Sequence, residues 1–165
     1  MKRVLVIGGN GSGKSTFSKK LGEKTGLPVV HLDKIFWCGN WEYVSREEFD
    51  ILLNAELEKE EWIIDGNFER TLEKRIQFCD TVFYFDFSTV QCLLGVTERV
   101  IKNYGKTRED MGENCPERFD FEFYKAIFRF NRKNRPRTKA LLEKYKPETI
   151  VFKNRKQVEK YLKSF

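Results

Sequence analysis

A run of glycines, one lysine and two hydroxyl residues directly follows the first hydrophobic stretch of the chain. Gly8, Gly13, Lys14 and Ser15 together satisfy the pattern G-x-x-x-x-G-K-[S/T]. Glycines let the backbone of such a loop wrap an anion closely, with its N–H groups pointing inward at the start of a helix. Lys14 then reaches the β- and γ-phosphates of a nucleotide, and the Ser15 hydroxyl ligates Mg²⁺. The predicted ATP-binding residues of this P-loop are Gly8, Gly9, Asn10, Gly11, Ser12, Gly13, Lys14, Ser15 and Thr16.

The glycine loop differs from the loop of dinucleotide-binding proteins. Those loops read G-x-G-x-x-G and are followed by an acidic residue that binds a ribose. The spacing behind the first hydrophobic run, Val4–Ile7, does not follow that pattern. The motif therefore indicates ATP binding with Mg²⁺, and it leaves open whether a phosphoryl group is transferred or the nucleotide is only held.

Two carboxylates stand directly after hydrophobic runs that are typical of buried strands. Asp33 follows "PVVHL" and Asp65 follows "EWII". In P-loop proteins a carboxylate at such a strand end positions magnesium, so Asp65 is a candidate metal and catalytic residue together with Ser15. The alternative for Asp65 is a turn former, because Asp-Gly is a common turn dipeptide. Asp33 is a candidate catalytic residue that orients or deprotonates an acceptor hydroxyl, or else it caps the segment that follows.

Arginine is concentrated between residues 99 and 137. Phosphoryl transfer needs positive charge on the transferred group and exclusion of water, which a closing lid with arginines supplies. Segment 103–118 is polar, contains glycine and lacks periodicity, so we expect a mobile lid outside the core, with Arg108 and Arg118 as catalytic residues at its two sides. The arginines of the whole stretch are Arg99, Arg108, Arg118, Arg129, Arg132, Arg135 and Arg137.

The later part of this stretch, "FRFNRKNRPRTK" (128–139), has three interpretations. In the favoured interpretation, its arginines grip phosphate. In the second, they form a solvated basic face, the usual position of charge runs. In the third, they form a nucleic-acid patch in which aromatic residues are interleaved with basic ones.

Aromatic residues gather just after Asp33, namely Phe36, Trp37, Trp41 and Tyr43. They line a pocket for a planar acceptor such as a nucleobase, or they pack in the core beneath a covering helix. His31 and Asp86 lie on predicted strands, and the sequence assigns neither of them to the site.

Strands alternate with helices along the chain. The strands are expected at 4–7, 28–33, 61–68, 81–87 and 148–152, and the helices at 14–24, 45–60, 72–77, from 89 onward, 119–133, 137–145 and 155–164, with Pro136 as a break. This alternation predicts an α/β P-loop NTPase: a five-stranded parallel sheet with helices on both faces and a short helical or loop lid. In such sheets ligands bind beyond the carboxyl ends of the strands, where the P-loop, Asp33 and Asp65 are all expected.

Composition sets limits on the class of protein. The chain has 165 residues, 40% of them hydrophobic, so we expect one packed domain over 1–165 with an acceptor or cap segment at about 34–61. Its net charge of +6 suits an anionic ligand but also ordinary solubility. The four cysteines form no CxxC pair, which argues against a zinc site or a disulfide framework. No run is long enough for a signal peptide or a membrane span, so a cytoplasmic location is expected.

These stretches resemble the P-loop kinases of the adenylate-kinase-like group, and within it the bacterial "topology modulation protein" family. The resemblance is carried by "GGNGSGKST", "HLDKIFW" with Trp41 behind it, "WIIDGNF", "GKTREDMGENCPER" and "RPRTKALLEKY", which span residues 4 to about 152. It implies a P-loop NTPase fold, ATP binding and an ATPase-like or kinase-like activity. The family takes its name from a proposed influence on DNA supercoiling.

The resemblance also assigns individual positions. "IIDGNFERT" is similar to the "DGFPRT" turn of adenylate kinases, which makes Asp65 the magnesium-side carboxylate, although one extra residue stands before Arg70. The helix after the fourth strand reads "CLLG" (92–95) where relatives tend to read C-L-Y-R. Gly95 thus replaces an arginine that could pack on the nucleotide base or phosphates, and Arg99, one helical turn later, is the substitute that the resemblance implies as a nucleotide-binding residue.

The leading hypothesis is an ATP-dependent kinase that phosphorylates a nucleotide, nucleoside or other small molecule, with Mg²⁺ as cofactor. The alternative is a nucleic-acid-associated ATPase that influences DNA topology, which is possible but not favoured. A third hypothesis is a nucleotide-binding switch with negligible catalysis. The sequence identifies neither the acceptor nor the oligomeric state.

Overall fold

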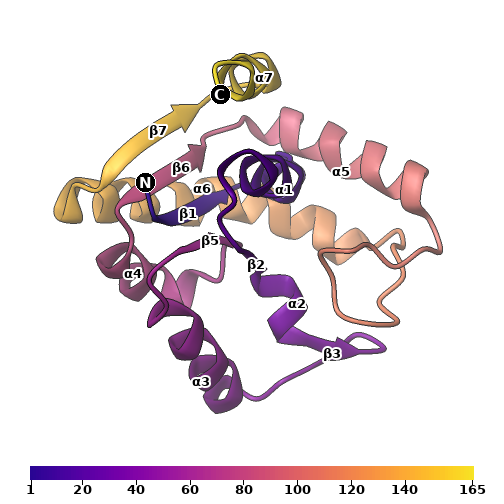
Figure 1. The fold of residues 1–165 in the computed structure, drawn as a ribbon. Helices are drawn as coiled ribbons and strands as arrows, with labels where there is room; N and C mark the ends of the chain where they lie inside the picture. The colour runs from indigo at the N-terminus through magenta and orange to yellow at the C-terminus, as the bar shows by residue number, and fades with distance from the viewer.

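Five parallel strands form the sheet of the computed structural model, which describes residues 1–165 apart from the side chain of Asn131 (Figure 1). The strands are β1 (Arg3–Gly8), β2 (Val29–His31), β5 (Trp62–Asp65), β6 (Thr81–Phe85) and β7 (Glu148–Phe152). Their order in the sheet is β2-β5-β1-β6-β7, and every neighbouring pair is parallel. The predicted five-stranded parallel sheet is confirmed, with the P-loop strand β1 at its centre.

Helices cover both faces of this sheet. They are α1 (Lys14–Thr25), α2 (Leu32–Phe36), α3 (Arg46–Leu57), α4 (Glu69–Phe78), α5 (Thr89–Asn103), α6 (Phe121–Tyr145) and α7 (Arg155–Lys163). Residues alternate between the two faces along a strand. Accordingly, Val4 and Val6 pack with α1, α5 and α7, whereas Leu5 and Ile7 pack with α3 and α4. Helix α6 contributes Ile127 to the first of these cores and Leu141 to the second, so it borders both.

Several helix ends follow from local sequence. Ser45 begins α3 by accepting a hydrogen bond from the Glu48 N–H, as the sequence predicts. Ser88 and Gln91 form a reciprocal capping box at the start of α5. Gly26 ends α1 in the left-handed conformation that favours glycine. No helix in the described chain is both long enough and apolar enough to cross a membrane.

The prediction of two helices separated at Pro136 is wrong. Helix α6 runs for 25 residues with Pro136 inside it. A proline within a helix costs about 3 kcal/mol, since it removes one hydrogen bond and crowds the preceding turn. Two ion pairs and a buried side chain lie near the proline: Arg135 Nε is 2.5 Å and Lys139 Nζ 3.3 Å from the carboxylate of Asp86, and Leu141 is buried.

The region after β2 also differs from expectation. Strand β2 ends at His31, and Asp33 lies in the first turn of α2. A short antiparallel hairpin follows, made of β3 (Trp37–Gly39) and β4 (Glu42–Tyr43). The sequence did not predict this hairpin, which carries most of the aromatic cluster.

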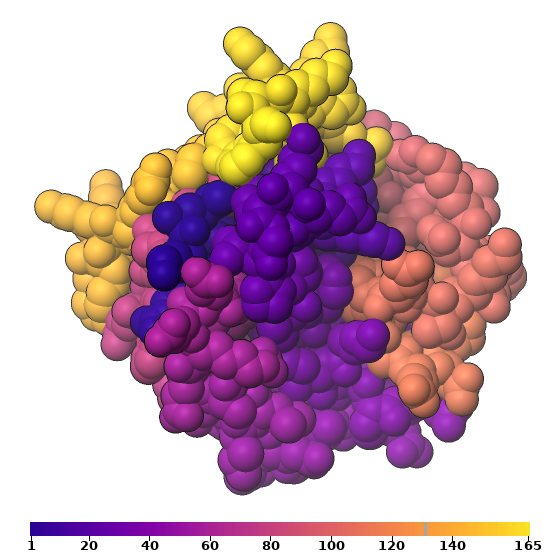
Figure 2. Space-filling model, viewed as in Figure 1, coloured from indigo at the N-terminus to yellow at the C-terminus, as the bar shows by residue number. Residues whose placement is uncertain are grey.

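The lid segment, residues 103–118, connects α5 to α6 and contains no helix. Two isolated bridges hold it together, Tyr104 with Glu117 and Thr107 with Pro116. It also packs against the hairpin, because the Trp41 N–H donates to Cys115 Sγ at 3.4 Å. Figure 2 shows the lid segment beside the chain that follows β2. Three of its side chains, Met111, Cys115 and Glu117, are buried, so the expectation of a segment wholly outside the core is wrong.

Candidate active site

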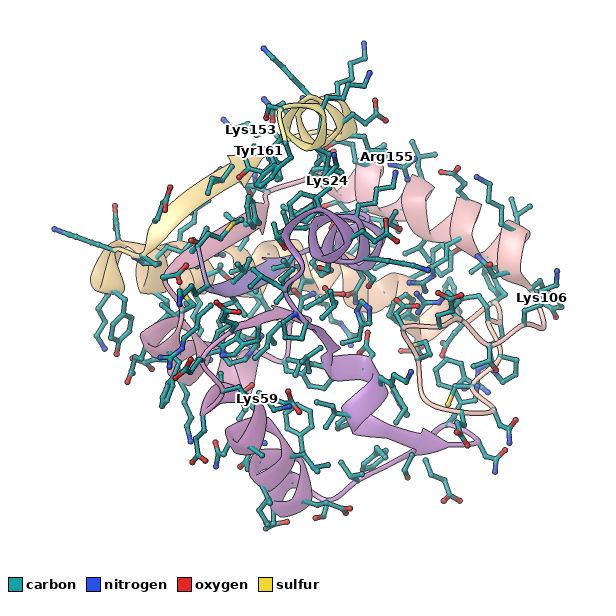
Figure 3. All side chains as sticks on the ribbon, in the orientation of Figure 1. Lys24, Lys59, Lys106, Lys153, Arg155 and Tyr161 are labelled. Carbon is teal, nitrogen blue, oxygen red and sulfur yellow. The ribbon has the colours of Figure 1, made fainter. Side chains whose placement is uncertain are left out.

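One large cavity of about 940 Å³ lies beyond the carboxyl ends of β1, β2 and β5. It is bounded by the P-loop and α1, the ends of β2 and β5, helices α5 and α7, and the lid segment. Arg155 lies between α7 and the start of α5, and Lys106 lies just beyond the end of α5 (Figure 3); both line the cavity. This volume falls within the range of small-molecule binding sites.

The P-loop is shaped by its own hydrogen bonds. Ser12 Oγ donates to the Gly9 carbonyl at 2.7 Å, and Lys14 Nζ donates to the same oxygen at 3.0 Å. Lys14 is 8% exposed, and burial lowers the pKa of its ammonium, while Asp65 and Asp33 oppose that shift. Its ammonium makes no ion pair among the described contacts. A buried cation held only by a carbonyl is suited to receive an anion.

Helix α5 packs directly on this loop. A Cβ placed on Gly95 would lie 2.0 Å from the Gly11 carbonyl oxygen, and a Cβ on Gly11 would lie 2.3 Å from the Cys92 carbonyl oxygen. Any larger residue at either position collides with backbone. Gly95, which the sequence comparison described as a lost arginine, is therefore required by the packing of this chain.

Asp65 and His31 meet across two adjacent strands. They are paired in the register of β2 with β5, and His31 Nδ1 lies 3.0 Å from Asp65 Oδ2. Asp65 is 4% exposed, and its other oxygen, Oδ1, is buried without a hydrogen-bond partner. A buried carboxylate oxygen without a partner is costly, and it suits a site that a cation or its water completes. His31 lines the cavity as well, although the sequence had assigned it no role.

Protein side chains at this site would supply only part of the coordination sphere of a magnesium ion. Ser15 and Asp65 both line the cavity, and the Ser15 hydroxyl hydrogen-bonds to Asp110. No group of three or more His, Cys, Asp or Glu side chains that could hold a metal occurs among the described residues. This set suits Mg²⁺, which keeps most of its water and binds through one or two protein groups together with phosphates.

Asp33 lies in the same part of the cavity. Burial raises the pKa of its carboxyl to about 6, and the nearby charge of Asp65 adds to the effect, while Lys14 and Arg108 oppose it. A carboxylate with a pKa near 6 is a better proton acceptor than an ordinary aspartate and is still mostly ionised at neutral pH.

The turn that follows β5 is fixed from two directions. Asn67 Oδ1 accepts the Gly8 N–H at 3.1 Å, and its Nδ2 donates to Asn10 Oδ1 at 3.2 Å. Arg75 of α4, 0% exposed, donates to the carbonyl oxygens of Gly66 and Phe68 at 2.8 and 3.0 Å and to that of Asn67. Burial lowers the pKa of the Arg75 guanidinium to about 9. The sequence analysis missed both Asn67 and Arg75; "DGN" after a buried strand was the signal for Asn67.

Arg99 of α5 and Arg108 of the lid segment converge on one carboxylate. The Nε atoms of both lie 3.0 Å from Glu117 Oε2, and Arg108 Nη1 also lies 2.7 Å from Asp110 Oδ2. Arg99, Arg108 and Asp110 line the cavity. The sequence analysis missed Glu117 and Asp110, because acidic residues in a polar loop carry no distinguishing pattern.

Arg118 does not line the cavity. Its guanidinium lies over the ring of Trp41, 4.9 Å from the centroid. The structure therefore does not bring Arg118 together with Arg108: only Arg108 of the two lines the cavity, and its contact with phosphate stays a prediction. The physical reason is a cation–π contact with the hairpin.

The arginines of 128–139 are also outside the cavity lining. Arg137 pairs with Glu69 at 3.5 Å, and Arg135 pairs with Asp86 as described above. Phosphate gripping by this segment, the interpretation that the sequence favoured, is wrong for this cavity. Arg70 is likewise engaged elsewhere, in a bidentate pair with Asp50.

The aromatic cluster packs mainly on itself. Phe36 stacks on Tyr43 with ring centroids 5.5 Å apart, and Trp37 meets Trp41 edge-on at 5.3 Å. None of these four side chains lines the cavity, whereas Phe68 does. Only Phe36 packs against the core, and Tyr43 is 67% exposed, so neither interpretation describes the whole cluster. Phe68 is the aromatic side chain of this region that lines the cavity.

Comparisons with known proteins support the fold. No protein-family model matches the chain, and no curated protein matches it. Among solved structures it is similar to the deoxyadenosine kinase from M. mycoides with bound dCTP. The match has a TM-score of 0.52 and 13% sequence identity, and it covers 98% of this chain and 96% of that chain. At this identity the likeness establishes a P-loop kinase fold.

Proposed function

We propose that this protein is a kinase that transfers the γ-phosphoryl group of ATP to a hydroxyl of a small molecule. The carrying observation is the meeting of Lys14, Asp33 and Asp65 in one cavity at the carboxyl ends of the strands. Lys14 supplies a buried cation for the phosphates, and Asp33 supplies a proton acceptor beside it. A protein that only held a nucleotide would have no need of an acceptor-side carboxylate with a raised pKa.

The nucleotide would lie in the P-loop, residues 8–16, with its γ-phosphate toward Lys14. Ser15 and Asp65 are the residues that would hold Mg²⁺ and its water. The ion, when bound, neutralises charge on the β- and γ-phosphates. The unpaired Asp65 Oδ1 supports this assignment, and the His31 contact fixes the orientation of the same carboxylate.

Asp33 would take the proton in the chemical step. An acceptor hydroxyl oxygen forms a bond to the γ-phosphorus, and the bond from that phosphorus to the β–γ bridging oxygen breaks. The hydroxyl proton passes to the Asp33 carboxylate, and the bond electrons leave with ADP. Asp33 returns the proton to solvent after product release.

Arg99 and Arg108 would stabilise the charge that spreads over the transferred group. Their position around Glu117 at the edge of the cavity supports this role. The resemblance to topology modulation proteins agrees with an ATP-dependent activity. A nucleic-acid role has weaker support, because Arg135, Arg137 and Lys139 are engaged with Asp86 and Glu69.

Replacement of the P-loop lysine tests the proposal. Lys14→Ala should lower acceptor-dependent ADP formation by about 100-fold or more, the usual loss when a group that stabilises transition-state charge is removed. Lys24→Ala is the matched control, since Lys24 is an exposed lysine of the same helix and does not line the cavity (Figure 3). Equal turnover by Lys14→Ala and wild type would contradict the kinase assignment.

A further inference from the structure

The part of the cavity that faces the P-loop serine is rich in carboxylates. Asp33 is electrostatically coupled to Asp65, Lys14, Arg108 and Asp110, and Asp110 is coupled to His31 and Ser15. These side chains therefore share one end of the cavity. We name it the acceptor end, and its residues are His31, Asp33, Asp65, Phe68, Arg108 and Asp110.

Arg108 is the only guanidinium of the acceptor end, and acidic partners already engage it. It contacts both Asp110 and Glu117. The other basic side chains that line the cavity come from α1, α5, α7 and the first residues of the lid segment. Arg70, the nearest counterpart of an acceptor-phosphate ligand by sequence, is held by Asp50 outside the cavity.

We infer that the phosphoryl acceptor is an uncharged hydroxyl compound that carries no phosphate group. This inference rests on the proposed kinase function and specifies its substrate class. A phosphorylated acceptor would place a second anion beside the carboxylates of Asp33, Asp65 and Asp110, and the guanidinium described at the acceptor end already has acidic partners. An alcohol instead needs a hydrogen-bond acceptor for its hydroxyl, which Asp33 provides, and an apolar surface, which Phe68 provides.

Matched pairs of acceptors test the inference. ADP formation from ATP and Mg²⁺ is measured with nucleosides against their 5′-monophosphates, and with free sugars against their sugar phosphates. We expect the unphosphorylated member of the active pair to have kcat/KM at least ~100-fold higher. The nucleoside and sugar arms show whether the alcohol carries a planar base.

A charge variant gives a second measurement. Asp110→Asn removes one of the two acidic partners of Arg108, so the rate ratio of phosphorylated to unphosphorylated acceptor should rise about 10-fold. Glu113→Gln, an exposed position of the same lid segment that does not line the cavity, should leave the ratio unchanged. Faster turnover of phosphorylated acceptors by wild type overturns this inference and leaves the kinase function intact. ADP formation that no acceptor stimulates overturns both.

A separate observation concerns the outer face of α5. Apart from Lys102, its exposed residues repeat at intervals of four and three: Val90, Leu94, Thr97, Ile101 and, one residue past the helix end, Tyr104. The four large side chains among them are between 64% and 75% exposed. This is the spacing with which one helix packs along another in a coiled coil.

Helix α6 extends the same apolar surface. Thr97 Oγ1 lies 3.1 Å from Tyr124 Oη, and the ring of Tyr124 lies 5.1 Å from that of Phe119. Phe121 precedes Tyr124 by three residues and Phe128 follows it by four, so both share the helix face of Tyr124. Seven of the 14 exposed large hydrophobic side chains in the described chain belong to this α5/α6 face.

We propose that a second copy of this chain covers the α5/α6 face. The seven side chains would bury roughly 600–800 Å² per copy, by the areas usual for such residues, which is close to the ~800 Å² per partner of a stable interface. Charges of both signs border the face, Glu98 with Lys102 and Glu122 with Lys125. A mixed border suits an identical partner, whereas nucleic acid or an acidic protein would require one sign.

The mass of the protein in solution tests this proposal. Size-exclusion chromatography with light scattering should give twice the 19.7 kDa chain mass for wild type, and Ile101→Glu or Leu94→Glu should give the chain mass itself. Ile51→Glu is the matched control, an equally exposed isoleucine (69%) on α3 that should remain dimeric. Wild type that is monomeric at ~100 µM, or a dimer that survives both α5 variants, overturns the proposal. Circular dichroism confirms that each variant is folded.

Discussion

Gly95 of helix α5 lies against the backbone of Gly11 in the P-loop, so closely that a Cβ at position 95 would stand 2.0 Å from the Gly11 carbonyl oxygen. The contact joins the helix that carries Arg99 to the loop that holds the phosphates. A shift of α5 would therefore displace both the arginine and the loop, and the geometry of the proposed nucleotide site depends on a residue that has no side chain.

Gly95→Ala should weaken ATP binding and destabilise the fold together. Insertion of a methyl group against packed backbone typically costs about 1–3 kcal/mol, and the strain falls on the loop that cradles the phosphates. Thermal unfolding with and without an ATP analogue measures both effects. Unchanged melting temperature and unchanged affinity would show that α5 and the loop are not in contact.

Asp33→Asn should abolish transfer and stabilise the protein at neutral pH. Loss of a general base typically lowers the rate by about 10²–10⁴-fold. Because burial raises the folded-state pKa from 3.8 to about 6, the folded protein retains a proton that the unfolded chain releases. Wild-type stability at this site therefore falls as pH rises from about 4 to about 6, and the asparagine variant avoids a cost on the order of 1 kcal/mol.

The pKa of Asp33 should also determine where the wild-type rate of transfer falls as the pH is lowered. Transfer needs ionised Asp33, so kcat/KM should fall below a midpoint near pH 6. Chemical denaturation of both proteins at pH 4 and pH 7, together with the rate profile, checks the two statements. A variant less stable than wild type at pH 7 would contradict the stability argument.

Glu117→Gln should lower stability and raise the stabilisation that ATP provides. Glu117 is 7% exposed and holds the guanidinium groups of Arg99 and Arg108. Removal of its charge leaves the half-buried guanidinium groups of Arg99 and Arg108 facing each other, with Asp110 as the remaining acidic partner of Arg108, at a cost of about 1–3 kcal/mol. The triphosphate then supplies the missing negative charge, so the ATP-induced rise in melting temperature should exceed that of wild type. Glu113→Gln serves as control. Equal ATP-induced shifts of the melting temperature in wild type, Glu117→Gln and Glu113→Gln would argue against contact of the two arginines with phosphate.

Arg75→Met should lower the free energy of unfolding more than the replacement of any exposed arginine. It removes the donors to three carbonyl oxygens of the turn after β5, and buried carbonyls without donors cost about 1–3 kcal/mol each. Arg70 lies on the same helix, and Arg70→Met breaks only an exposed ion pair. It should therefore lower the free energy of unfolding by less than about 1 kcal/mol. Urea denaturation of the two variants compares them directly, and similar midpoints would contradict this role of Arg75.

The sequence was sufficient for the parallel sheet and for the P-loop because both depend on local pattern. A hydrophobic run followed by a glycine loop and a helix start determines where Lys14 and Ser15 must lie. Asp33 and Asp65 could be placed for the same reason, since each stands at the end of a hydrophobic run in the sequence, although β2 before Asp33 is only partly buried. Their use in metal binding and proton transfer stays a proposal.

The remaining features depend on contacts between distant segments. Glu117 and Arg75 acquire their roles only when the lid segment closes on α5 and when α4 folds back on the turn before it. Arg118 turns to Trp41, 77 positions earlier in the chain, and no spacing in the sequence indicates that contact. The two side chains of α6 that flank Pro136, Arg135 and Lys139, pair with Asp86, which precedes the lid segment in the chain.

The two halves of the cavity have different origins in the chain. The segments at the carboxyl ends of strands β1, β2 and β5 carry Lys14, Asp33 and Asp65, whereas a single loop between α5 and α6 carries Arg108 and Asp110. Under the proposed function, substitutions in that loop would alter which acceptor is recognised, while the sheet would preserve the proposed triphosphate pocket. Acceptor preference could then diversify during evolution separately from the chemistry of transfer.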